Sequence, residues 1–148
     1  MKKLLAILVL CALPLVGDLP QVFLQGGGNA TYYDSKGRIS CISTQNGNRT
    51  TYKDASGRLI GTAVKDHNGR TTYQDNRGRN IGYSYQSGNQ TFYRDQTGRA
   101  VATASQLGSQ TGYRNAKGQN IGTAANHNGK HTTFRNANGT ISGTKVGK

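Results

Sequence analysis

The chain has 148 residues, enough for one domain, with 33% hydrophobic residues, 21 glycines, no tryptophan, no glutamate and a formal net charge of +13. Low hydrophobicity with high net charge is typical of disordered chains, but aromatic residues and glycines recur here at a regular period, which favours an ordered fold. Because a glycine falls about every ten residues, helices would be broken before they reached a stable length, and helical folds are excluded.

The first 17 residues have the pattern of a secretory signal peptide. Lys2 and Lys3 precede an apolar run of 13 residues, Leu4 to Val16, which is too short to span a bilayer. Leu10 before Cys11 does not fit a lipoprotein site, so we expect an exported protein without a lipid anchor or a transmembrane span after cleavage near Gly17. Cleavage would leave 17 basic and six acidic residues, a net charge of +11, in the periplasm, at the cell surface or outside the cell.

Residues 18–29 form the next segment, an apolar stretch followed by three consecutive glycines. We interpret it as a flexible leader, or as a strand that adds to the edge of a sheet. Beyond it, Cys41 is the one cysteine left in the mature chain, so an internal disulfide is excluded. Cys41 is predicted to be a small buried strand residue, with an intermolecular disulfide as the alternative.

A repeat of 20 or 21 residues fills the rest of the chain, residues 30–148, six times with the last copy truncated. It aligns on the glycines Gly37, Gly57, Gly78, Gly98, Gly118 and Gly139. Five residues before each glycine stands an aromatic residue: Tyr32, Tyr52, Tyr73, Tyr93, Tyr113 or Phe134. Asp or Asn stands three residues before the glycine, and a second glycine marks the middle of most repeats.

Each repeat is predicted to be a β-hairpin. Asp54-Ala55-Ser56-Gly57 has the chemistry of a type I turn followed by a left-handed glycine, and the flanking runs are rich in Thr, Tyr and Ile. Counting outward from the turn places Lys53 opposite Leu59 and Tyr52 opposite Ile60. The same count pairs Tyr73 with Ile81, Tyr93 with Val101 and Tyr113 with Ile121, and it pairs the terminal Tyr32 with Ser40 and Phe134 with Ser142.

This register predicts one face carrying Thr50, Tyr52, Ile60 and Thr62, and an opposite face carrying Thr51, Lys53, Gly61 and Ala63. The fold class expected is all-β, an antiparallel meander of about six hairpins that is curled or stacked as a small repeat array. Such a sheet must bury its tyrosine ladder by folding on itself or against a second copy. The degenerate end repeats are expected to cap the stack, and open edge strands would allow self-association.

The run from Tyr52 to Leu59 (YKDASGRL) and the run from Tyr93 to Arg99 (YRDQTGR) resemble the YD repeat of RHS-type bacterial surface and toxin proteins. In that family the repeats imply β-hairpin units on secreted or surface proteins, without catalysis by the repeats. The family's tyrosine commonly stands directly before the aspartate, which only Tyr33-Asp34 does here. Six repeats are also too few for that family's large shell.

No catalytic, metal or cofactor site is predicted. Three histidines, His67, His127 and His131, lie at or near turns and do not supply the converging ligands that a metal needs. Each aspartate is explained by a turn, and no serine stands in a recognisable nucleophilic motif.

Basic residues recur in two rows, which are the predicted polyanion-binding residues. One row follows the turn glycine, and the other precedes the turn aspartate or asparagine: Arg38, Arg58, Arg79 and Arg99, then Lys53, Arg94, Arg114 and Arg135. Beside regularly spaced tyrosines such rows suit an anionic polymer or sugar. The alternative is that these arginines only pair with turn aspartates and stay solvated.

Three functions follow as hypotheses. The first is a non-enzymatic exported β-repeat protein that acts in adhesion or self-assembly. The second is a binding module for an anionic glycan or lipopolysaccharide, with nucleic acid disfavoured because the chain carries an export signal and no nucleic-acid motif. The third is an inhibitor or exclusion factor acting on another envelope protein.

Overall fold

The computed structural model describes residues 15–16, 19–20 and 28–147. The predicted signal peptide (1–17) and leader (18–29) therefore lie almost entirely outside the described residues. Within them, the two short strands β1 (Leu15–Val16) and β2 (Leu19–Pro20) pair antiparallel with each other.

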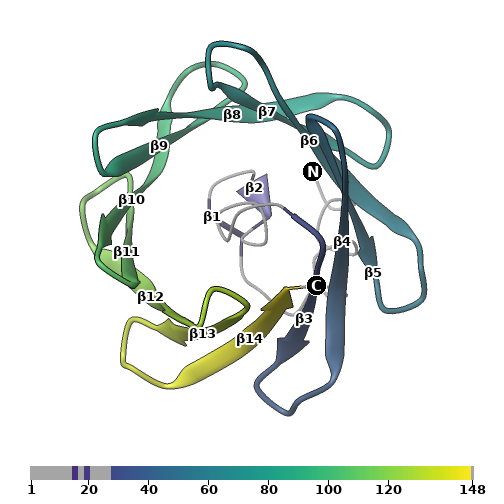
Figure 1. Ribbon diagram of the computed structural model, residues 1–148. Helices are drawn as coiled ribbons and strands as arrows, with labels where there is room; N and C mark the ends of the chain where they lie inside the picture. The colour runs from purple at the N-terminus through teal and green to yellow at the C-terminus, as the bar shows by residue number, and fades with distance from the viewer. Residues whose placement is uncertain (1–14, 17–18, 21–27, 148) are drawn as a thin grey trace.

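The repeat region forms a closed barrel of twelve antiparallel strands, each hydrogen-bonded to its neighbours in the sequence (Figure 1). The strands are β3 (Ala30–Asp34), β4 (Ile39–Asn46), β5 (Arg49–Asp54), β6 (Leu59–Lys65), β7 (Thr71–Asp75), β8 (Asn80–Ser87), β9 (Gln90–Asp95), β10 (Ala100–Leu107), β11 (Gln110–Asn115), β12 (Asn120–His127), β13 (His131–Asn136) and β14 (Ile141–Gly147). The predicted all-β hairpin meander is confirmed. Its sheet curls on itself to bury the tyrosines.

Closure comes from the pairing of the first and last barrel strands, with Tyr33 of β3 opposite Thr144 of β14. The expectation of open edge strands is therefore wrong, because both edges of the meander are consumed by this pair. The expectation that the end repeats cap a stack is wrong for the same reason, since they pair with each other.

The turns that follow β3, β5, β7, β9, β11 and β13 have the predicted geometry. In the turn after β5, the Gly57 N–H donates to the Asp54 carbonyl and Gly57 has a φ of +83°. The Asp54 carboxylate accepts from the backbone N–H groups of Ser56 and Arg58 at 2.8 and 3.0 Å. Equivalent glycines Gly78, Gly98 and Gly118 have φ values of +77°, +86° and +77°. Only glycine adopts this conformation at low cost, which explains the strict period.

The predicted register is right at the turn and wrong one residue further. Lys53 lies opposite Leu59 as predicted, but Tyr52 lies opposite Gly61 because a bulge at Ile60 inserts one extra residue. Every repeat has this bulge, so the aromatic positions pair with Cys41, Gly61, Gly82, Ala102, Gly122 and Gly143 rather than with the predicted Ser40, Ile60, Ile81, Val101, Ile121 and Ser142.

The bulge corrects part of the predicted faces. Ile60 is buried in the core with Tyr52, as predicted. Thr50 and Tyr52 share the inner face with Gly61 and Ala63, whereas Thr62 lies opposite Thr51 on the other face. A small residue opposite each ring leaves room inside the barrel, where a β-branched residue in the same register would compete for that space.

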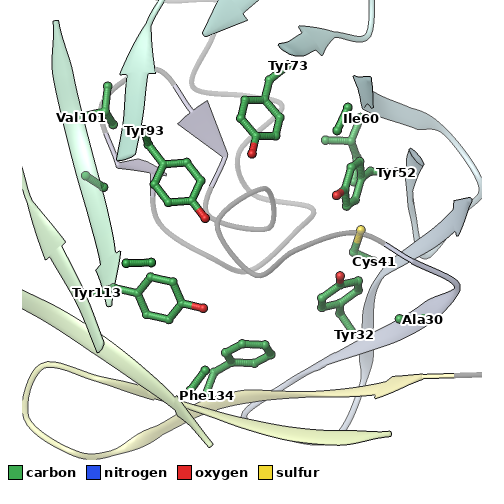
Figure 2. Packing of buried hydrophobic residues seen from close by; sticks show 14 residues of the cluster. Ala30, Tyr32, Cys41, Tyr52, Ile60, Tyr73, Tyr93, Val101, Tyr113 and Phe134 are labelled. Carbon is green, nitrogen blue, oxygen red and sulfur yellow. The ribbon is translucent and has the colours of Figure 1, made fainter. Parts of the chain in front are cut away.

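The core contains a ring of six aromatic side chains that point into the barrel, and smaller residues such as Ile60 and Val101 are buried with them (Figure 2). All six, at the repeat positions Tyr32, Tyr52, Tyr73, Tyr93, Tyr113 and Phe134, are at most 8% exposed. Cys41 is a free thiol with 0% exposure, as expected for a buried strand residue. An intermolecular disulfide would require the barrel to open.

Candidate functional site

A cavity of about 600 Å³ lies inside the barrel, toward the end where Gly47 and Gly69 form turns. Tyr52, Tyr73 and Tyr93 contribute to its wall. The Tyr73 hydroxyl lies 2.8 Å from the Ser84 hydroxyl, and the rings of Tyr73 and Tyr93 stack with centroids 6.4 Å apart.

Burial raises the pKa of Tyr52, Tyr73 and Tyr93, which line the cavity, so these three side chains are neutral at physiological pH. The pKa of Tyr73 and of Tyr113 is about 12, and that of Tyr52 lies well above its usual value. Lys145 also lies on the inner side, with Nζ 5.7 Å from the centre of the Tyr32 ring, and burial lowers the pKa of its ammonium. This interior offers hydroxyl and ring contacts.

Among the described residues, no group of three or more His, Cys, Asp or Glu side chains is placed to hold a metal ion. His127 and His131 face each other across the β12–β13 hairpin, with ring centroids 5.9 Å apart. In the same part of the chain, no helix is long and apolar enough to cross a membrane.

The two predicted basic rows are brought together at one end of the barrel, which we call the basic ring. Its members are the residues given above, Arg38, Lys53, Arg58, Arg79, Arg94, Arg99, Arg114 and Arg135. They flank the turns after odd-numbered strands, and in an up-and-down barrel all those turns lie at one end. Three further cations, Lys36, Arg77 and Lys117, lie within the same turns.

Three arginines of the basic ring are held in one common geometry. Arg94, Arg114 and Arg135 each donate one guanidinium N–H to the carbonyl of the turn glycine four residues later, at 2.8 Å in every case. A guanidinium has five N–H donors, so each of these side chains is oriented by the turn and keeps donors for a ligand.

Two other arginines of the ring form ion pairs with turn aspartates. Arg38 pairs with Asp34 at 2.9 Å and Arg79 pairs with Asp75 at 2.7 Å, yet their side chains remain 72% and 61% exposed. The predicted alternative, that turn-flanking arginines pair with aspartates, therefore holds for these two. Both still present charge to solvent.

The aspartate carboxylates at this end of the barrel accept hydrogen bonds from groups within their own turns. At Asp95 the Thr97 hydroxyl donates at 2.7 Å, and this bond is the largest influence holding the pKa of the carboxyl below its usual value. At Asp34 the Arg38 backbone N–H has the leading effect in the same direction. Because these anions are satisfied locally, the outward-facing groups of the ring are mainly cationic.

The outer face of β8 and β9 carries an aromatic patch that was not predicted from the sequence, defined by Tyr83, Tyr85 and Phe92 with Arg70 and Arg94. Tyr85 and Phe92 stack with centroids 5.3 Å apart and planes 19° apart. The Arg70 guanidinium lies 3.7 Å from the Tyr83 ring centre. Comparing the outward position of every repeat would have revealed these rings, because the other repeats have none there.

No protein-family model matches the sequence, and no curated protein matches it. A solved X-ray structure of a protein from Arabidopsis thaliana is similar, with a TM-score of 0.57, 8% sequence identity and coverage of 81% of this chain and 81% of that chain. At this identity the similarity shows a shared fold alone.

Proposed function

We propose that this protein is an exported, non-enzymatic binding module whose basic ring holds an anionic glycan, either a uronic-acid polysaccharide or the charged part of lipopolysaccharide. The observation that supports this proposal is the gathering of two basic rows around one end of a closed barrel. In a flat sheet the same residues would spread along a ladder, whereas the barrel concentrates them around a single rim.

The chemistry of the ring suits carboxylate, sulfate or phosphate groups. Arginine presents a planar fork that matches these oxyanions in a bidentate way, and it stays charged at every physiological pH. Turn carbonyls already orient Arg94, Arg114 and Arg135, so less side-chain entropy is lost when a ligand binds. Many exposed contacts of this kind are individually weak, and their sum would depend strongly on salt.

Adhesion by self-assembly has less support. The two surfaces expected to self-associate were the open sheet edges and the tyrosine face. In the closed barrel the two edge strands pair with each other, and the tyrosines are buried inside. The inhibitor hypothesis has no residue evidence of its own.

Binding of the purified exported protein to octagalacturonate, measured by isothermal titration calorimetry at 50 and 200 mM NaCl, tests the proposal. A variant carrying Arg58→Gln, Arg79→Gln and Arg99→Gln should bind at least tenfold more weakly and with a shallower salt dependence. Glutamine is the residue that the fifth repeat has at this position, Gln119, so the turns should form normally.

The matched control carries Arg49→Gln, Lys65→Gln and Lys130→Gln, which removes the same charge from the opposite end of the barrel. It should keep most of the affinity. Equal losses in both variants would show attraction by net charge alone, and absence of binding by the unmodified protein would refute the proposal.

A further inference from the structure

The six repeats provide an internal standard for the outer face of the barrel. At the outward position of Tyr83, the other repeats have Ile42, Thr62, Thr103, Thr123 and Thr144. At that of Tyr85 they have Thr44, Val64, Ser105, Ala125 and Val146, and at that of Phe92 they have Thr31, Thr51, Thr72, Gly112 and Thr133. The barrel therefore forms without aromatic residues at these positions.

All three departures fall on two adjacent strands and one face. Tyr83 lies opposite Arg94, and Tyr85 lies opposite Phe92, so the three rings and the arginine make one continuous patch. Each ring is half-buried, which leaves part of it in contact with solvent. Three aromatic residues that the scaffold does not need, gathered at one place, indicate a contact surface.

The patch is held in a defined arrangement. The Arg94 guanidinium donates to the Tyr85 hydroxyl at 3.2 Å and to the Gly98 carbonyl at 2.8 Å. It is therefore fixed between the side chain of Tyr85 and the turn that contains Gly98. Arg70 lies over Tyr83 within cation–π distance. The described ion pairs involve neither Arg70 nor Arg94, and both keep their charge for a ligand.

Flat aromatic faces beside guanidinium groups fit the chemistry of an acidic sugar. The apolar C–H face of a pyranose ring packs on an aromatic ring, while its carboxylate accepts hydrogen bonds from arginine. Arg94 belongs both to this patch and to the basic ring. One polymer can therefore contact the basic ring at the end of the barrel and continue along the outer face of β8 and β9.

We infer that the aromatic patch of Tyr83, Tyr85 and Phe92 is a stacking subsite for the sugar rings of the anionic glycan, with Arg70 and Arg94 holding its carboxylates. This inference rests on the proposed function. It adds that the patch recognises the shape of the sugar rings, whereas the basic ring recognises the charges of the glycan. The basic ring supplies attraction for any polyanion, and the patch supplies selectivity for sugar rings.

The test uses a patch variant, Tyr83→Thr, Tyr85→Val and Phe92→Thr, which installs the residues of the second repeat and leaves every arginine in place. Its thermal unfolding should confirm that it folds. Calorimetry with octagalacturonate should show about tenfold weaker binding with an unchanged salt dependence. The carboxyl-reduced, neutral oligomer should bind weakly to the unmodified protein and not measurably to the patch variant.

A control variant with Thr123→Ala and Thr133→Ala changes the same outer face on β12 and β13, away from the patch, and should bind like the unmodified protein. Unchanged affinity in the patch variant, together with loss in the basic-ring variant, would overturn this inference and leave the proposed function standing. If the unmodified protein does not bind the glycan, both fail.

Two other outcomes would replace the glycan as occupant. Patch-dependent binding of oligothymidylate that is tighter than binding of octagalacturonate would identify a nucleic acid, because bases also stack on aromatic rings. Dimers seen by light scattering in the unmodified protein and lost in the patch variant would identify a second copy of the chain.

Discussion

Every strand of the barrel has an inner and an outer side, and the six repeats differ in how much their residues vary on the two sides. On the inner side each repeat places one aromatic ring opposite a small residue or glycine, with little variation. On the outer side, the positions equivalent to Tyr83, Tyr85 and Phe92 hold Thr, Ser, Ala, Gly, Val or Ile in the other repeats, so the three aromatic residues on β8 and β9 are a local departure.

The comparison separates what packing requires from what it permits. Inside a closed barrel the volume is fixed, so a ring in one repeat constrains its neighbours in the next. Outside, a side chain contacts solvent and a few neighbours, and the fold tolerates many choices. A departure from the repeat is therefore informative on the outer side, where the fold does not demand it.

The largest effect on stability is expected when Tyr93 and Phe92, adjacent residues that point to opposite sides of the sheet, are substituted separately. Tyr93 is 5% exposed in the core, and Phe92 is half-buried on the outer face. Tyr93→Ala should lower the free energy of unfolding by about 3–5 kcal/mol, because it removes a buried ring and enlarges the cavity that Tyr93 lines. Phe92→Thr should change it by less than about 1 kcal/mol. Urea unfolding followed by circular dichroism would measure both, and a larger loss in the Phe92 variant would contradict the assignment of sides.

A second, smaller effect is expected at two strand glycines. A methyl group on the inward Gly143 would lie 2.4 Å from the Tyr33 carbonyl oxygen, where backbone must move. A methyl group on the outward Gly112 would meet nothing within 4 Å. Gly143→Ala should therefore destabilise the barrel by about 1–3 kcal/mol, as other overpacked sites do.

Gly112→Ala provides the control for that prediction. It should be neutral or slightly stabilising, because alanine loses less backbone entropy than glycine on folding. Equal urea midpoints for the Gly112 and Gly143 variants would show that the inner side is less tightly packed than the close approach at Gly143 indicates.

The same contrast explains which features the sequence could predict. Turn glycines, turn aspartates and the aromatic period are local signals, so the strands, the turns and a shared face for the tyrosines were predictable from them. The bulge at Ile60 was not, because a single extra residue leaves no composition signal, yet it moves Gly61 and Ala63 to the inner side.

Closure and the aromatic patch were missed for different reasons. Closure depends on β3 pairing with β14, strands at opposite ends of the repeat region, and no local pattern encodes a contact at that separation. The patch could have been predicted from the sequence, but only by comparing Tyr83, Tyr85 and Phe92 with the residues at equivalent positions of the other repeats.

The smallest effect on stability is expected at the turns, where the aspartate carboxylates titrate. The carboxyls of Asp34, Asp54, Asp75 and Asp95 all have pKa values below the usual one in the folded chain. A lowered folded pKa means that the charged form stabilises the fold above the unfolded value, about 3.9, and that this contribution is lost as the pH falls through the folded values. The unmodified protein should therefore show a lower Tm at pH 2.5 than at pH 7.

The chain contains its own control for this acid effect, because the fifth and sixth repeats have Asn115 and Asn136 in place of the aspartate. Both asparagines accept the same backbone hydrogen bonds through a side-chain oxygen that does not titrate in this range. A variant with all four aspartates changed to Asn should fold, and its Tm should fall less between pH 7 and pH 2.5 than that of the unmodified protein. Equal falls in both would mean that acid acts through general charge repulsion, and that the turn carboxylates stabilise the barrel by geometry alone.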